Sequence, residues 1–372
     1  MPVISPRLRI RRPAFGKSGF APSSATNDRL SDLAGVKSNP GSLRARCYVP
    51  KNLPANAPLV VVLHGCTQDA AVYDHGSGWS TLADRHGFAL LYPEQVRANN
   101  PMLCFNWFSS GDIRRGTGEA ASIAAMVETM QRSYGLDPAR TFVTGLSAGG
   151  AMTSVMLATH PEMFAAGAIL AGVAYGCADS VGEAFECMNG HSRSDGGDLA
   201  APVRRASRHK GPWPRVQVWQ GSADRTVVPS NADAIVRQWA QLHDLRGEAD
   251  RHDEVEGYPR RAWLDASGEP LIEHISVTGM AHGVPLAGKG DEAVGQAGAH
   301  MLDVGLSSTH CIAGFFGIAE ARPAGKAVKA APAARPREEA KPEPRAQKRP
   351  ARAVSGPQAV IEKALRAAGL MR

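Results

Sequence analysis

The chain has 372 residues, of which 43% are hydrophobic and 21% charged, with 39 glycines and 26 prolines. This composition suffices for a packed core, and it excludes a coiled coil, a collagen-like repeat and a wholly disordered chain. The formal net charge of +7 comes from the ends, because residues 1–30 sum to +5, residues 321–372 to +9 and residues 31–320 to −7. We therefore expect no nucleic-acid partner for the central part.

The sequence gives no indication of a membrane span, a metal site or a bound cofactor. No run of about 18 apolar residues occurs. The six cysteines include no CxxC pair, and the 12 histidines include no HExxH motif. The N-terminus is basic but lacks the apolar core of a secretory signal. We therefore expect no cofactor. The missing signal favours the cytoplasm, with another export route as the alternative, so the compartment stays open.

Strands and helices are expected to alternate from about residue 42 onward. Near-continuous apolar runs such as PLVVVLHG at 58–65 are typical of strands that are buried on both faces. Alternation of such strands with amphipathic helices predicts an α/β fold with a mainly parallel central sheet flanked by helices. The sequence predicts strands at 43–50, 58–65, 88–93, 139–145, 164–172, 215–221 and 273–277, and helices at 78–87, 119–135, 148–161 and 231–245.

The composition divides the chain into a body with two unlike ends. Residues 1–40 are expected to form an irregular basic arm, with one short helix around 27–33. Residues 41–320 are expected to form the α/β domain. Within this domain, 178–214 is a polar insertion, which we expect near a functional site because loops this long are often functional. Residues 321–356 are rich in Ala, Pro, Lys and Arg and are predicted to be a disordered linker. An amphipathic helix is expected at 357–372, either solvated on its tether or anchoring a partner or an apolar surface.

A strand-to-helix turn carries the strongest motif. Gly145-Leu146-Ser147-Ala148-Gly149 matches G-x-S-x-G, after an expected strand and before an expected helix. Such a turn strains the serine backbone, projects the hydroxyl above the sheet and accepts only small flanking residues. The following helix points free N–H groups and its positive dipole end at the reacting oxygen. The motif predicts that Ser147 is a nucleophile, the alternative being a glycine-rich turn without chemistry.

A serine nucleophile needs a general base and an acid that orients the base. With a nucleophile on such a turn, the acid and then the base follow the serine along the chain. Asp224 follows the strand expected at 215–221, and His282 follows the strand expected at 273–277, in a glycine-flanked loop. We expect Ser147, Asp224 and His282 to form a catalytic triad, the alternative for Asp224 being a helix cap.

Acyl transfer also needs donors for the oxyanion. One donor is normally the N–H of the residue after the serine, here Ala148, and the other comes from the loop after an early strand. Leu63-His64-Gly65-Cys66 occupies that place, so the Cys66 N–H is the second candidate. A nucleophilic role for the Cys66 thiol is the alternative, but no histidine and acid are placed to activate it.

Several segments together resemble a known family. VVVLHGCTQ, LLYPEQ, CFNWF, GLSAGGAM, GSADRTVVP and MAHGVP occur in that order and resemble the poly(3-hydroxybutyrate) depolymerase-type esterases. These are α/β-hydrolases similar to feruloyl and acetylxylan esterases, and the family is largely secreted. The resemblance covers roughly residues 42–318. It implies a serine esterase with the same triad and with oxyanion donation near Cys66 and Ala148, and it is less specific for the substrate.

The resemblance also places the segment that starts at Cys104 near the site. It implies substrate contacts for Asn106 and Trp107. A disulfide between Cys66 and Cys104 would then hold the oxyanion amide in place, where a misplaced donor is costly. A second candidate pair spans the start of the insertion: Cys177 and Cys187. The alternative is that all six cysteines are reduced, as in a cytosolic protein.

The expected function is hydrolysis of polyhydroxyalkanoate-like or short-chain carboxylic esters through an acyl-enzyme. A feruloyl- or acetylxylan-type esterase is one alternative, and a peptidase of the same fold is another. A non-catalytic granule- or surface-binding protein that keeps the fold is an alternative of a different class. The basic C-terminal tail is expected to favour adsorption to anionic or apolar surfaces.

Overall fold

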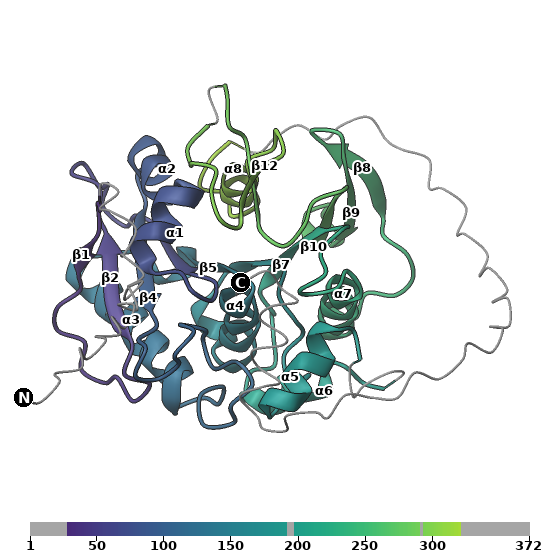
Figure 1. The fold of residues 1–372 in the computed structure, drawn as a ribbon, viewed down its shortest axis with the longest axis horizontal. Helices are drawn as coiled ribbons and strands as arrows, with labels where there is room; N and C mark the ends of the chain where they lie inside the picture. Colours follow the sequence, from purple (N-terminus) through teal and green to yellow (C-terminus); the bar gives the residue numbers. More distant parts are fainter. Residues whose placement is uncertain (1–27, 192–196, 291–292, 321–372) are drawn as a thin grey trace, which may run out of the picture.

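Figure 1 shows the fold as a computed structural model, which describes residues 28–191, 197–290 and 293–320. The linker predicted at 321–356 and the helix predicted at 357–372 lie outside the described residues, as does most of the expected N-terminal arm. Within the described ranges, no helix combines the length and the apolar character that a membrane crossing requires.

A ten-stranded sheet forms the centre of the molecule, in the order β1-β2-β4-β3-β5-β6-β7-β10-β9-β8. Neighbouring strands from β4 to β10 are parallel, and antiparallel strands extend the sheet at both ends. The mainly parallel sheet flanked by helices is therefore confirmed. The strands are β1 Ser31–Asp32, β2 Arg44–Tyr48, β3 Leu59–Leu63, β4 Ala89–Glu94, β5 Thr141–Leu146, β6 Ala166–Leu170, β7 Arg215–Gly221, β8 Arg251–Val255, β9 Tyr258–Leu264 and β10 Pro270–Val277, with β11 Val284–Leu286 and β12 Met301–Asp303 in a separate pair.

Helices cover both faces of the sheet and make a hydrophobic core on each. Figure 1 shows α1, α2 and α8 on one side and α4 to α7 on the other. In β3, whose side chains alternate between the faces, Val60 and Val62 enter one core and Leu59, Val61 and Leu63 the other. This explains why the strand reads as an unbroken apolar run. The helices are α1 Ala70–Ser77, α2 Trp79–His86, α3 Gly118–Tyr134, α4 Ala148–Thr159, α5 Val181–Met188, α6 Ala201–Ala206, α7 Ser230–Leu242 and α8 Ser308–Phe315.

The chain joins the sheet earlier than the sequence suggested. Ser31 and Asp32 pair antiparallel with Cys47 and Arg46, and Leu33 is buried in the core. The helix expected around 27–33 is therefore wrong, and the boundary expected at residue 41 lies too late. The reason is tertiary, since a two-residue edge strand has no periodicity of its own and forms only because β2 offers free backbone groups.

A buried ion pair joins the two strands at the other end of the sheet. Arg260 of β9 donates to both carboxylate oxygens of Asp253 on β8, through Nε at 2.7 Å and a terminal nitrogen at 2.6 Å. The side chains are only 12% and 3% exposed, and Arg260 also lies 3.4 Å from Glu273 of β10. The bidentate geometry satisfies charges that would be costly to leave unpaired.

We expect Asp253→Ala to lower the free energy of unfolding by about 3 kcal/mol, because it leaves the Arg260 guanidinium buried with one partner fewer. The matched control is Glu128→Ala, since Glu128 pairs with Arg132 at 3.4 Å and both side chains are more than half exposed. That change should cost less than about 1 kcal/mol. Urea unfolding followed by circular dichroism measures both free energies of unfolding. Equal losses would contradict the view that the Asp253–Arg260 pair stabilises the fold more than an exposed pair does.

Candidate active site

Ser147 lies in a strained turn between β5 and α4. Its backbone has φ 58° and ψ −117°, a combination that residues with a side chain rarely adopt. The chain approaches itself so closely here that a Cβ on Gly149 would lie 2.2 Å from the Leu63 carbonyl oxygen, and one on Gly145 would lie 2.5 Å from the Gly149 backbone. The two glycines of the motif are therefore required by backbone contact.

Asp224 follows β7 and is held by four hydrogen bonds. Its Oδ1 accepts from the N–H groups of Thr226 and Val227, at 2.8 and 3.0 Å. Its Oδ2 accepts from Nε2 of Gln220 at 3.2 Å and contacts Nδ1 of His282 at 2.7 Å. The carboxylate is buried, so these partners fix its orientation. Asp224 does not cap α7, because the first N–H groups of that helix donate no capping hydrogen bond to a side chain.

The loop that carries His282 is attached to the loop that carries Asp224. The Ala223 N–H donates to the Met280 carbonyl at 3.0 Å, and the Gly279 N–H donates to the Ser222 hydroxyl at 2.8 Å. A Cβ on Gly221 would lie 2.3 Å from the Met280 oxygen, so this approach also needs a glycine. The two loops thus bring Asp224 and His282 together although 58 positions separate them.

Within the described residues, the Ser147 hydroxyl makes no hydrogen bond to His282. Such contacts are often long in free enzymes and tighten only with substrate. The other side of the His282 loop is fixed, because Nδ1 of His300 lies 3.1 Å from the His282 carbonyl oxygen.

The two amides expected to bind an oxyanion are available. Among the hydrogen bonds of the described residues, none uses the N–H of Cys66 or of Ala148 as donor. The loop around Cys66 is nevertheless firmly held. The Gly65 N–H donates to Oε1 of Gln68 at 2.9 Å, the Thr67 N–H donates to the Met102 carbonyl at 2.7 Å, and Cys66 is disulfide-bonded to Cys104.

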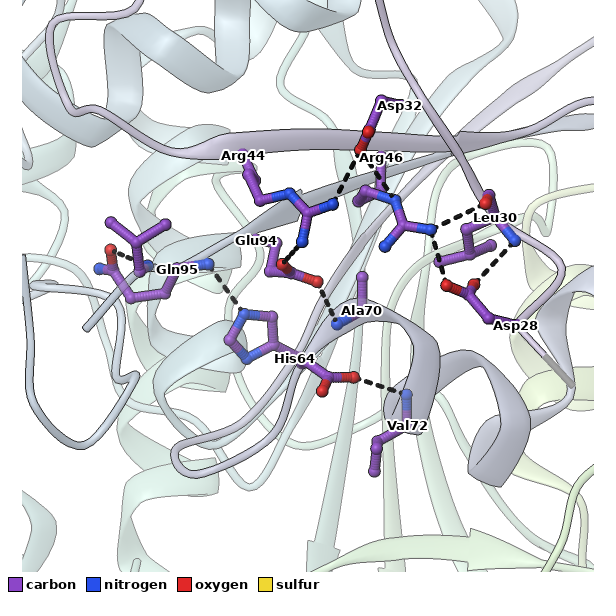
Figure 2. Close-up of polar contacts among 12 residues, drawn as sticks. Asp28, Leu30, Asp32, Arg44, Arg46, His64, Ala70, Val72, Glu94 and Gln95 are labelled. Carbon is purple, nitrogen blue, oxygen red and sulfur yellow. Dashed lines mark hydrogen bonds and ion pairs between the residues drawn. The ribbon is translucent and has the colours of Figure 1, made fainter. Parts of the chain in front are cut away.

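Both ends of this loop bond to the end of β4, one to its last residue, Glu94, and one to the next residue, Gln95 (Figure 2). At its start, the Gln95 N–H donates to Nε2 of His64 at 3.1 Å, while Nδ1 of His64 donates to the Gly65 carbonyl at 2.8 Å. Burial lowers the pKa of His64, which favours the neutral imidazole. Because Nε2 accepts from the Gln95 N–H, the proton of this neutral ring lies on Nδ1. At the end of the loop, the Ala70 N–H donates to Oε2 of Glu94 at 3.0 Å.

The segment expected to contact substrate is largely buried. Trp107 is 8% exposed and belongs to the core. Both polar groups of the Asn106 side chain bond to protein, since Nδ2 donates to Glu119 at 2.7 Å and Oδ1 accepts from Asn100 at 3.0 Å. Substrate contact by Asn106 and Trp107 stays a prediction.

Helix α5, at the start of the insertion expected at 178–214, lies against the loop that follows Asp224. The Cys177–Cys187 disulfide, the second predicted pair, joins α5 to the segment that precedes it. The Val228 N–H and the Asn231 side chain both donate to the Met188 carbonyl, at 2.9 and 3.0 Å. The insertion therefore supports the acid loop.

Two residues of this region were missed by sequence reasoning. Gln95 and Glu119 are almost completely buried polar residues that bond to one another behind the Cys66 loop. A glutamate in the first turn of a helix is so common that the pattern carries no signal for such a role. In the part of the chain that the structure describes, no cluster of three His, Cys, Asp or Glu residues could hold a metal ion.

Comparison with known proteins places the chain among esterases. Residues 45–255 match the family described as esterase PHB depolymerase. Poly(3-hydroxyalkanoate) depolymerase C of Paucimonas lemoignei is 46% identical over 303 residues, covering 80% of this chain and 72% of that protein. A probable acetylxylan esterase A of Aspergillus clavatus is 34% identical over 272 residues, covering 71% and 87%.

A solved structure agrees with these relatives. Acetyl xylan esterase from Aspergillus awamori superposes with a TM-score of 0.63 at 30% identity, covering 68% of this chain and 93% of that one. The predicted fold class and enzyme class are thereby confirmed. The chain belongs to the PHB depolymerase-type esterase family, and it is a carboxylic ester hydrolase with the α/β-hydrolase fold.

Proposed function

We propose that Ser147, His282 and Asp224 form the catalytic triad of this esterase. The observation that carries the proposal is the 2.7 Å contact between Nδ1 of His282 and Oδ2 of Asp224, at the edge of the sheet where Ser147 occupies its strained turn. A buried carboxylate in this position fixes the imidazole tautomer, so that Nε2 is free to accept a proton.

In the proposed reaction, His282 takes the hydroxyl proton as Ser147 attacks the ester carbonyl. The tetrahedral oxyanion is bound by the N–H groups of Cys66 and Ala148, and protonated His282 gives its proton to the departing alkoxide. This leaves an acyl group on Ser147. Water then attacks the acyl-enzyme, His282 accepts its proton, and collapse of the second intermediate returns that proton to Ser147 and releases the acid.

The relatives support a proposal for the substrate class. The depolymerase of Paucimonas lemoignei is named for poly(3-hydroxyalkanoate) and shares 46% identity with the chain over most of its length. We propose esters of 3-hydroxyalkanoates, as oligomers or polymer ends, as the preferred substrates. A second candidate is the acetyl ester of xylan, which the 34% identical relative and the superposed structure support by their names.

Ser147→Ala should abolish ester hydrolysis while leaving the fold intact. We expect kcat on p-nitrophenyl butyrate to fall by about 10⁴–10⁶-fold, because removing the nucleophile disables the triad as a unit. Steady-state assays alongside circular dichroism measure this. A folded variant that kept a tenth of the original turnover would show that Ser147 is not the nucleophile.

The substrate proposal is tested by a panel of 3-hydroxybutyrate oligomers, acetylated xylo-oligosaccharides and methyl ferulate. We expect kcat/KM to be at least about tenfold higher on the hydroxybutyrate oligomers than on the other two substrates. The hydroxybutyryl group is larger than acetyl, and each additional methylene that a pocket buries contributes about 1–3 kcal/mol. A preference for the acetylated sugar of the same size would instead support the second candidate.

We further propose that the tail at 321–372, with its charge of +9, promotes adsorption to anionic or apolar surfaces rather than catalysis. Removing residues 321–372 should leave kcat on p-nitrophenyl butyrate within about twofold, since none of the proposed catalytic residues lies there. The same truncation should reduce sedimentation of the protein with anionic lipid vesicles, and more so at low salt. Lost activity on the soluble ester would contradict the division of roles.

A further inference from the structure

A buried carboxylate lies behind the Cys66 loop, in the first turn of α3. Glu119 is 1% exposed, and among the described residues three donors reach its oxygens. Oε1 accepts from Nε2 of Gln95 at 2.6 Å and from Nδ2 of Asn106 at 2.7 Å, and Oε2 accepts from the Asn106 N–H at 2.8 Å. An ionised carboxylate, which only accepts hydrogen bonds, fits this set of donors.

Gln95 connects this carboxylate to one side of the Cys66 loop. Its side chain donates both to Glu119 and to the Cys104 carbonyl, at 2.6 and 3.0 Å. Its backbone N–H holds the neutral His64 ring, two residues before Cys66 (Figure 2). A displacement of Gln95 would therefore move the start of the loop.

Asn106 connects the same carboxylate to the other side. Glu119 holds both the backbone and the side chain of Asn106. Two residues earlier, Cys104 is bonded covalently to Cys66. Cys66 is thus linked to Glu119 by two routes, one through His64 and one through the disulfide, and Gln95 touches both.

We propose that Glu119 is a positioning residue for ester hydrolysis, whose carboxylate holds Gln95 and Asn106 so that the Cys66 N–H points at the developing oxyanion. The inference rests on the proposed function, since it takes the Cys66 amide as an oxyanion donor. The expected effect is large, because losing one such donor costs about 10²–10³-fold in rate and a displacement of about 1 Å costs up to about 10²-fold.

The charge of Glu119 makes the role testable by pH. Burial raises the pKa of Glu119 to about 7, the charge of Asp112 adds to the rise, and the hydrogen bonds from Asn106 and Gln95 oppose it. The groups that bond to Glu119 are uncharged amides. Above about pH 7 the carboxylate accepts all three bonds, whereas below it one oxygen carries a proton that faces a donor. Protonated Glu119 therefore resembles glutamine in its hydrogen bonding.

The test is Glu119→Gln, assayed on p-nitrophenyl butyrate from pH 5.5 to pH 8.5. At pH 8.5 we expect kcat/KM to fall by about 10–100-fold, because the new NH₂ group must face a donor. Affinity for butylboronic acid, whose adduct with the serine places an oxygen among the oxyanion donors, should fall in parallel. At pH 5.5 the two proteins should differ by less than about fivefold, because only about 3% of Glu119 is still ionised there. Any pH dependence of the remaining steps is common to both proteins and cancels in the ratio.

Glu128→Gln is the matched control, because Glu128 lies on the same helix, is exposed and pairs with Arg132. It should change none of these quantities. A residue that only stabilised the fold would give a ratio independent of pH and an unchanged affinity for the boronic acid, and either result would overturn the proposal. Equal kcat/KM at pH 8.5 would overturn it as well.

If Glu119→Gln does not fold, Gln95→Met provides the second measurement. It removes the donor to Glu119 and keeps the length of the side chain, so kcat and boronic-acid affinity should fall together. Unchanged values would overturn the proposal. Ser147→Ala separates this inference from the function on which it rests. If Ser147→Ala is inactive and Glu119→Gln resembles the parent at pH 8.5, only the role of Glu119 fails.

Discussion

The site depends on one close approach of backbone to backbone, where the turn after β5 lies against the end of β3. Gly149 lies so near the Leu63 carbonyl that no side chain fits between them, and Ser147 is left with a positive φ. This contact places the start of α4 beside the Cys66 loop. The proposed oxyanion donors, the amides of Cys66 and Ala148, could face one point only with both backbones this close.

The other parts of the site are arranged around this contact by loops at the carboxyl ends of parallel strands. Such loops gather at one edge of the sheet and are where ligands bind in open α/β folds. Here they are joined to one another as well as to their strands. Ala223 bonds to Met280, Thr67 bonds to Met102, and the insertion bonds to the acid loop through Met188. The loops that carry Asp224, His282 and Cys66 are thereby each supported from a second element.

Behind the reactive groups lies a second set of buried polar residues. Glu94 and Gln95 end the LLYPEQ segment and Glu119 lies outside the quoted motifs, and together they hold both ends of the Cys66 loop and the segment bonded to it. Buried polar groups are costly unless every partner is present. Their bonds therefore select one arrangement of the loop, which a purely apolar support would not do.

The sequence by itself determined the features that are local. Apolar runs such as that of β3 predicted the parallel sheet, because strands buried on both faces need apolar residues at every position. The G-x-S-x-G motif predicted the turn at Ser147, because only glycine permits so tight a contact. Only the tertiary structure decided that residues 31–32 form an edge strand and that Glu119 faces Gln95 and Asn106. Those features depend on partners distant along the chain, and a single residue's type carries no information about which partner the fold will bring to it.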